Sequence, residues 1–316
     1  MKLTTTALTL LFLAVAAFAQ APAPQTGQTI RVEPNASKGF SYPYFLYIPT
    51  AKEGESATRT LFVMPNNTGK PIDDLAEHEK SAKGKLVQAI FILNKLDMPI
   101  LVPVFPRPEK EWKIYTHALD RDTLSTELTD YKRLDLHLAA MIGDAQERLA
   151  VQKSPVGKKV FVYGFSASGM FANRFAFLHP DLVKAAVIGS PGGWPIAPVS
   201  KFKGTKLRYP LGISDVKELT GSKIDLDVLR EVPFFFFLGA EDENDSLVFR
   251  DGYEQEDEEL ALPLLGMKRV DRWPVSESLY KEAKLDATFK LYEGEGHRPS
   301  RKMIEDMIEF LAKHKY

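Results

Sequence analysis

Short apolar runs alternate with longer stretches of mixed apolar and polar residues along most of this 316-residue chain. Apolar runs bounded by turn-forming residues are typical of buried strands, whereas apolar residues that recur about every 3.6 positions are typical of a helix with one buried face. Residues 71–83 are mostly polar and are open to either a short helix or a loop. The pattern elsewhere predicts strands at residues 29–33, 44–48, 60–64, 98–105, 160–163, 183–188, 232–238 and 287–292, and helices at residues 85–96, 134–151, 170–178 and 303–314.

The order of these segments predicts the fold class, which is α/β. Strands alternate with helices, and several strands are apolar on both faces, as in a mostly parallel central sheet with helices on both faces. The strands at 29–33 and 44–48 are joined too closely for a crossover, so we expect them to pair antiparallel at one edge. Residues 194–230 contain no clean strand and are predicted to form a lid-like insertion over the carboxyl edge of the sheet.

Composition and charge narrow the classes of function. Hydrophobic residues make up 44% of the chain and charged residues 26%, which excludes disordered and collagen-like chains. The formal net charge of -1 gives no electrostatic basis for binding nucleic acid or an anionic membrane surface. The chain has no cysteine, so disulfides, thiolate catalysis and cysteine-ligated metal sites are excluded. The acidic run at 254–259 is expected to be a solvated surface segment.

The first residues have the pattern of an export signal. Lys2 precedes an apolar stretch at residues 7–17, and a small-x-small cleavage site ends at Ala19. The apolar stretch is too short to span a bilayer comfortably, although an uncleaved anchor is the alternative. We therefore expect a signal peptide at residues 1–19 and a single domain at residues 20–316. The mature protein is expected in the periplasm or outside the cell, without a stable membrane anchor.

The motif Gly164-Phe165-Ser166-Ala167-Ser168 lies between a predicted strand and a predicted helix. A serine on such a tight turn projects its hydroxyl out of the backbone, at the positive end of the helix, where an anionic intermediate is stabilised. The turn requires small residues around the serine. We therefore predict that Ser166 is a nucleophile; Ser168 replaces it only if the turn is shifted along the chain.

An acid and a histidine follow two further predicted strands. In open α/β sheets, reactive groups gather at the edge formed by the carboxyl ends of the strands. Asp242 and Asp245 follow the strand at 232–238, and His297 follows the last strand. A neutral histidine can take the proton of a serine hydroxyl, while a carboxylate on its far nitrogen fixes the tautomer. We predict His297 as the base and Asp242, the nearer turn position, as the acid, with Asp245 as the alternative.

The other five histidines lie away from the end of the last strand, and His78, in a polar stretch, is expected to be solvated. An oxyanion hole needs two N–H donors beside the serine. One is expected from the backbone of Ala167, and the other from the loop after the strand at 60–64, with Asn67 preferred and Asn66 next.

Phe165 and Trp194 are candidate pocket residues, and Trp194 either lines the acyl pocket or anchors the insertion. Residues 115–122 either border the pocket or form a structural loop. The sequence has no His-Glu-x-x-His, no phosphate-binding loop and no dinucleotide fingerprint that opens a helix. We therefore expect neither a metal nor a cofactor.

Over nearly all of the mature sequence the chain resembles the α/β-hydrolases, through the motif around Ser166 and the chain order of serine, acid and histidine. The resemblance implies Ser166 as nucleophile, Asp242 as acid and His297 as base. Family members usually have glycine where this chain has Ser168, and we expect serine to be small enough to fit there. The fold also occurs in proteins with other activities and in inactive relatives, so the site has to establish the function.

These features predict an exported serine hydrolase that cleaves a small-molecule carboxylic ester through an acyl-enzyme intermediate. A peptidase or amidase that uses the same triad is the alternative within the enzyme class. A catalytically silent binding protein on the same fold is the alternative from a different class. The sequence leaves the acyl-chain length and the oligomeric state open.

Overall fold

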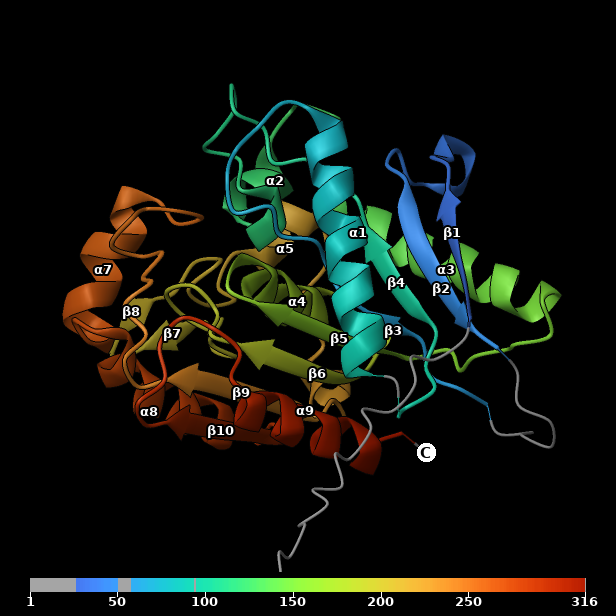
Figure 1. The fold of residues 1–316 in the computed structure, drawn as a ribbon. Coiled ribbons are helices and arrows are strands. Elements are labelled where there is room, and N and C mark those ends of the chain that lie inside the picture. Colours follow the sequence, from blue (N-terminus) through green and yellow to red (C-terminus); the bar gives the residue numbers. More distant parts are fainter. Residues whose placement is uncertain (1–26, 51–57, 94, 316) are drawn as a thin grey trace, which may run out of the picture.

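The computed structural model describes residues 27–50, 58–93 and 95–315 (Figure 1). The signal peptide predicted at residues 1–19 lies outside this part of the chain. Among the residues that are described, no helix is long and apolar enough to cross a membrane.

An eight-stranded sheet runs through the described part of the chain, with its strands in the order β1-β2-β4-β3-β5-β6-β9-β10 (Figure 1). Strand β2 pairs antiparallel with both β1 and β4, and all other neighbours pair parallel. The mostly parallel sheet and the antiparallel N-terminal pair are therefore confirmed. The strand bounds are β1 Gly27–Val32, β2 Tyr44–Pro49, β3 Phe62–Val63, β4 Ile100–Pro103, β5 Val160–Phe165, β6 Val183–Gly189, β9 Phe234–Gly239 and β10 Ala287–Tyr292.

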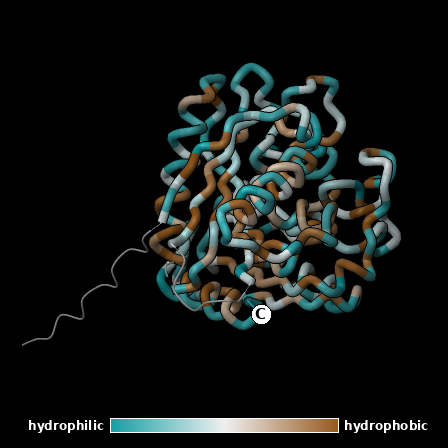
Figure 2. Tube along the Cα trace, turned by 90° about the vertical axis from the view of Figure 1, so that its right-hand side faces the viewer, coloured by the Kyte–Doolittle hydropathy of each residue, from teal (hydrophilic) through white to brown (hydrophobic). Residues whose placement is uncertain are grey.

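Helices cover both faces of the sheet, as predicted. Helices α1 (Leu75–Ile92) and α9 (Arg301–Lys313) cover one face, and α3 (Leu134–Val151), α4 (Ala167–Leu178) and α8 (Arg269–Glu282) cover the other (Figure 1). Successive side chains of a strand point to opposite faces, so the four consecutive phenylalanines of β9 fill both apolar layers. Figure 2 shows hydrophobic residues along the interior strands and hydrophilic residues on the outer turns.

The predicted insertion at 194–230 begins beyond the carboxyl end of β6, where β7 and β8 lie (Figure 1). It ends at the opposite edge of the sheet, because α6 leads into the amino end of β9, which is parallel to β6. The indole N–H of Trp194 donates to the carbonyl of Leu211 at 2.9 Å, and this tryptophan is 1% exposed. The N–H of Ile196 donates to Asn173 Oδ1 at 2.9 Å. The backbone N–H of Trp194 donates to the Tyr253 hydroxyl at 3.1 Å, and that hydroxyl donates to the Trp194 carbonyl at 2.8 Å, so Trp194 anchors the insertion to a residue outside it. The insertion contains the short elements β7 Lys201–Phe202, β8 Thr205–Lys206, α5 Val216–Thr220 and α6 Leu226–Leu229.

Several elements differ from the sequence prediction. Helix α1 begins at Leu75, well before the predicted start, because the Asp74 side chain accepts the N–H of Ala76 at 2.9 Å and caps the helix. The acidic run at 254–259 opens α7 (Gln255–Leu265) instead of lying wholly in solvent. The expectation is wrong for Asp257, which is 1% exposed and forms an ion pair with Arg208 at 2.7 Å. The remaining short helices are η1 Ala36–Lys38, η2 Thr116–Ala118 and α2 Arg121–Ser125.

Candidate active site

Ser166 lies on the tight turn between β5 and α4, with φ of 61° and ψ of -125°. A positive φ is strained for any residue with a side chain, so the surrounding turn has to impose it. A Cβ atom added at Gly164 would lie 1.8 Å from the carbonyl oxygen of Ser168, and one added at Gly169 would lie 2.7 Å from that of Gly189. Only glycine fits at positions 164 and 169, which lets the turn hold the serine in this conformation.

Ser168 fits into the same turn. Its Oγ accepts the N–H of Phe165 at 3.1 Å and donates to the carbonyl oxygen of Phe165 at 2.9 Å. The side chain is buried, so its hydroxyl is committed to the backbone. Ser166 instead keeps a half-buried hydroxyl that points away from its own turn toward His297.

The three residues predicted to act together meet at the carboxyl edge of the sheet. Nε2 of His297 lies 2.9 Å from Ser166 Oγ, and Nδ1 lies 2.9 Å from Asp242 Oδ2. The carboxylate can only accept, so Nδ1 carries the proton and Nε2 accepts the hydroxyl hydrogen. The loops after β9 and β10 are joined directly, because the N–H of Glu241 donates to the carbonyl of Glu295 at 2.9 Å.

A buried arginine that the sequence analysis missed holds the other carboxylate oxygen of Asp242. Nη1 of Arg269 lies 2.6 Å from Asp242 Oδ1, and the N–H of Asn244 donates to the same oxygen at 3.0 Å. Burial acts to raise the pKa of Asp242, but the hydrogen bond with His297 and the charge of Arg269 outweigh burial and lower the pKa to about 2. Asp242 is therefore ionised at any pH near neutrality.

Asp245, the alternative acid, lies in a different pair. Its Oδ2 lies 2.5 Å from Nη2 of Arg272, and its Oδ1 accepts the N–H of Leu247 at 3.2 Å. The structure thus brings Asp242, and not Asp245, to the histidine.

The candidate oxyanion donors lie on two loops that meet at this edge, because β3 and β5 are parallel neighbours in the sheet. Ala167 is the first residue of α4, where a backbone N–H has no acceptor within the helix. The N–H groups of Asn67 and Asn66 likewise have no backbone acceptor within the described ranges. All three candidate donors are therefore free of backbone partners.

A buried network fixes the shape of the loop at 65–69. The amide of Asn66 bonds both the N–H and the carbonyl of Phe105, at 3.0 and 2.9 Å. His117 donates through Nε2 to the same carbonyl at 2.8 Å, and its Nδ1 accepts the N–H of Thr68 at 3.3 Å. Nδ1 of His78 lies 2.7 Å from Thr68 Oγ1. Two histidines and an asparagine side chain therefore hold the loop in place through buried hydrogen bonds.

Both histidines are 0% exposed, so the expectation that His78 is solvated is wrong. The reason is that its partners Thr68, Ile72 and Arg107 come from other segments and enclose it. Burial lowers the pKa of His117 to about 3 and also lowers the pKa of His78, so both rings are neutral. Residues 115–122, which contain His117, act as a structural support.

Of the two candidate pocket residues, Phe165 lines a cavity beside the site and Trp194 does not. The ring centroid of Phe165 lies 5.0 Å from that of His297. Among the described residues, no group of histidine and acidic side chains could hold a metal ion.

Comparison with solved structures finds similar folds over most of this chain. Poly(aspartic acid) hydrolase-1 from Sphingomonas sp. KT-1 has a TM-score of 0.59 at 18% identity, covering 91% of this chain and 98% of that chain. A poly(3-hydroxybutyrate) depolymerase from Bordetella parapertussis has a TM-score of 0.60 at 16% identity, covering 92% and 90%. An S-formylglutathione hydrolase from Agrobacterium tumefaciens has a TM-score of 0.50 at 12% identity, covering 92% and 95%. No family model matches the chain, and no curated protein matches it.

Proposed function

We propose that this chain, which has the α/β-hydrolase fold, is a serine hydrolase that cleaves carboxylic esters through an acyl-enzyme. The observation that carries the proposal is the unbroken series of contacts from Ser166 Oγ through His297 to Asp242, each at 2.9 Å. A silent binding protein does not require a strained serine held within hydrogen-bond distance of a histidine. From the N-terminal pattern at residues 1–19 we also propose that the protein is exported.

In the proposed reaction, Ser166 Oγ attacks the ester carbonyl carbon while Nε2 of His297 takes the hydroxyl proton. The N–H groups of Ala167 and Asn67 donate to the oxyanion that develops on the carbonyl oxygen. Asp242 stabilises the imidazolium, which then gives its proton to the leaving alcohol. Water then attacks the acyl carbon while His297 takes a proton from it. The bond between that carbon and Ser166 Oγ breaks, His297 returns the proton to Oγ, and the carboxylic acid is released.

The alternative of amide cleavage uses the same groups, since the same triad attacks either carbonyl. Hydrolysis in general is supported by the names of the similar structures, which include a depolymerase, a poly(aspartic acid) hydrolase and an S-formylglutathione hydrolase. An ester is the first choice because an alkoxide leaves more readily than an amide nitrogen.

Labelling with a fluorophosphonate probe tests the proposed nucleophile. A fluorophosphonate reacts with a serine that an adjacent base activates, so we expect one adduct per chain, on the peptide that contains Ser166. Mass spectrometry of the digested protein locates the adduct. A chain that hydrolyses no p-nitrophenyl ester or anilide and takes up no probe is not a serine hydrolase.

Replacing Arg269 by methionine is expected to move the acidic limb of the pH profile of kcat/KM to higher pH, by about one unit. Without the arginine charge, the full negative charge of Asp242 acts on the imidazolium of His297 and stabilises it. The base is then lost to protonation at a higher pH. The profile is obtained from rates of ester hydrolysis measured between pH 5 and pH 9, at pH values about half a unit apart.

The matched control is Arg272→Met, which removes an equally buried arginine whose partner is Asp245. It is expected to lower stability while leaving the limb in place. A limb that moves equally in both variants, or in neither, contradicts a role for Arg269 in positioning and polarising Asp242.

A further inference from the structure

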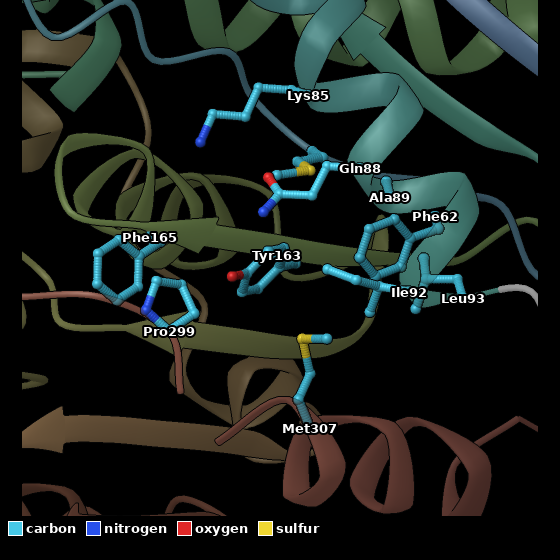
Figure 3. Close-up of a pocket in the computed structure, with 11 residues that line it drawn as sticks. Phe62, Lys85, Gln88, Ala89, Ile92, Leu93, Tyr163, Phe165, Pro299 and Met307 are labelled. Atoms are coloured by element: carbon cyan, nitrogen blue, oxygen red, sulfur yellow. The ribbon is translucent and has the colours of Figure 1, made fainter. Parts of the chain in front are cut away.

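A cavity of about 90 Å³ lies between α1 and α9, against the side chains of β3 and β5 (Figure 3). Apolar side chains line one end of it, among them Phe62, Leu93 and Met307. The other end is closed by Phe165 and Pro299 (Figure 3). The volume corresponds to about three water molecules in the liquid, so it suits a group of only a few heavy atoms.

Three polar groups gather at the Phe165 end of this cavity. Lys85 and Gln88 extend from α1 toward that end, and the hydroxyl of Tyr163 points the same way (Figure 3). No hydrogen bond or ion pair connects any of the three to another residue of the described chain. The lining contains no acidic side chain. Tyr163 is buried, Lys85 is half-buried and Gln88 is exposed, so the ammonium and the amide lie toward the solvent side of the cavity and none of the three groups has a protein partner among the residues described.

These groups make the polar end selective for an anion. Burial lowers the pKa of Lys85, because no carboxylate compensates for its desolvation. Burial raises the pKa of Tyr163, so its hydroxyl remains a donor. A half-buried cation without a counter-charge gains from an anion that enters the cavity, and a carboxylate accepts hydrogen bonds from all three donors.

The polar end lies next to the proposed catalytic base. The Phe165 ring that closes the cavity packs on the imidazole of His297 at 5.0 Å between centroids, and Pro299 follows that histidine along the chain. A ligand in the cavity is thus separated from the imidazole by one aromatic ring.

We propose that this cavity binds a short-chain carboxylate. Its carboxyl group accepts hydrogen bonds from Lys85, Gln88 and Tyr163, and its alkyl chain lies against Phe62 and Met307. A carboxylic acid is also what ester hydrolysis releases; the identification of this ligand as the product class rests on the proposed function, whereas the binding site itself does not.

Calorimetric titration of butyrate into the full Ser166→Ala chain tests the site without turnover. Butyrate is expected to bind saturably. Lys85→Met is expected to raise the dissociation constant by at least about tenfold, which corresponds to the loss of one charge-assisted hydrogen bond. The control is Lys83→Met, which removes an exposed lysine from the same helix and should leave binding unchanged. Butanol, which has the same length without the charge, should bind at least about tenfold more weakly than butyrate.

Three results would overturn the proposal. The first is no saturable binding of butyrate up to about 100 mM, a concentration well above a millimolar affinity. The second is equal binding by Lys85→Met and Lys83→Met, and the third is equal binding of butanol and butyrate. Because the Ser166→Ala background cannot form an acyl-enzyme, none of these results depends on whether the intact chain hydrolyses esters.

Discussion

Replacing Ser166 by alanine is expected to lower kcat for a p-nitrophenyl ester by about 10⁵- to 10⁶-fold and to abolish fluorophosphonate labelling. The alanine cannot form the acyl-enzyme, so only the oxyanion donors and substrate binding remain to accelerate direct attack by water. Folding should be unaffected, because the Ser166 hydroxyl contacts only His297 among the described side chains. Steady-state kinetics and gel-based labelling of the purified chain measure both effects.

Ser168→Ala is the matched control for this variant. It removes a hydroxyl two positions away that bonds only the backbone of Phe165. We expect a loss of about 1 kcal/mol in the free energy of unfolding, with labelling retained. If Ser166→Ala still labels while Ser168→Ala does not, the nucleophile has been assigned to the wrong serine.

Replacing Asp242 by asparagine is expected to lower kcat by about 10⁴-fold. An amide can donate to Nδ1 of His297, which favours the tautomer with its proton on Nε2, and this tautomer cannot accept the proton of Ser166. The imidazolium also loses the carboxylate that stabilises it. The variant leaves Arg269 buried without its counter-charge, so the free energy of unfolding should fall by about 3–5 kcal/mol. Urea unfolding and ester kinetics on the folded fraction separate the two effects.

Asp245→Asn distinguishes loss of a catalytic acid from loss of a buried ion pair. Asp245 pairs with Arg272 much as Asp242 pairs with Arg269, but it does not contact the histidine. We expect a similar loss of stability and a kcat within about tenfold of the original. Equal losses of kcat in the two variants would mean that Asp242 acts through the fold and not through His297.

The sequence predicted the elements that a strong apolar pattern defines. The helix predicted at 134–151 and the strand predicted at 287–292 have the observed bounds, and Ser166, Asp242 and His297 were each placed correctly beyond a strand. Strand β3 is shorter than predicted, at Phe62–Val63. The flanking apolar residues still bond to the adjacent strands, since the carbonyl of Leu61 accepts the N–H of Phe161 at 2.9 Å and the N–H of Met64 donates to the carbonyl of Leu101 at 3.0 Å.

The elements that the sequence did not reveal are built from polar residues with distant partners. Helix α8 buries Arg269 and Arg272, and an arginine in a sequence ordinarily indicates an exposed position. Their burial depends on Asp242 and Asp245, which lie more than a helix length away along the chain. His78 is buried by contacts with Thr68 and Ile72, which precede its helix, and with the backbone of the more distant Arg107. Pairing between remote segments leaves no local periodic signal, so these residues become visible only in three dimensions.

The two histidines beneath the loop at 65–69 also give the fold a sensitivity to acid. In the unfolded chain a histidine takes up a proton near pH 6.5, but His117 inside the fold does so only near pH 3. Across the interval between these values the unfolded chain binds more protons than the folded one, so acidification withdraws stability from the native state. The His117 ring that shapes the loop at neutral pH therefore destabilises the fold in mildly acidic solution, at pH values well above the pKa of His117 in the folded chain.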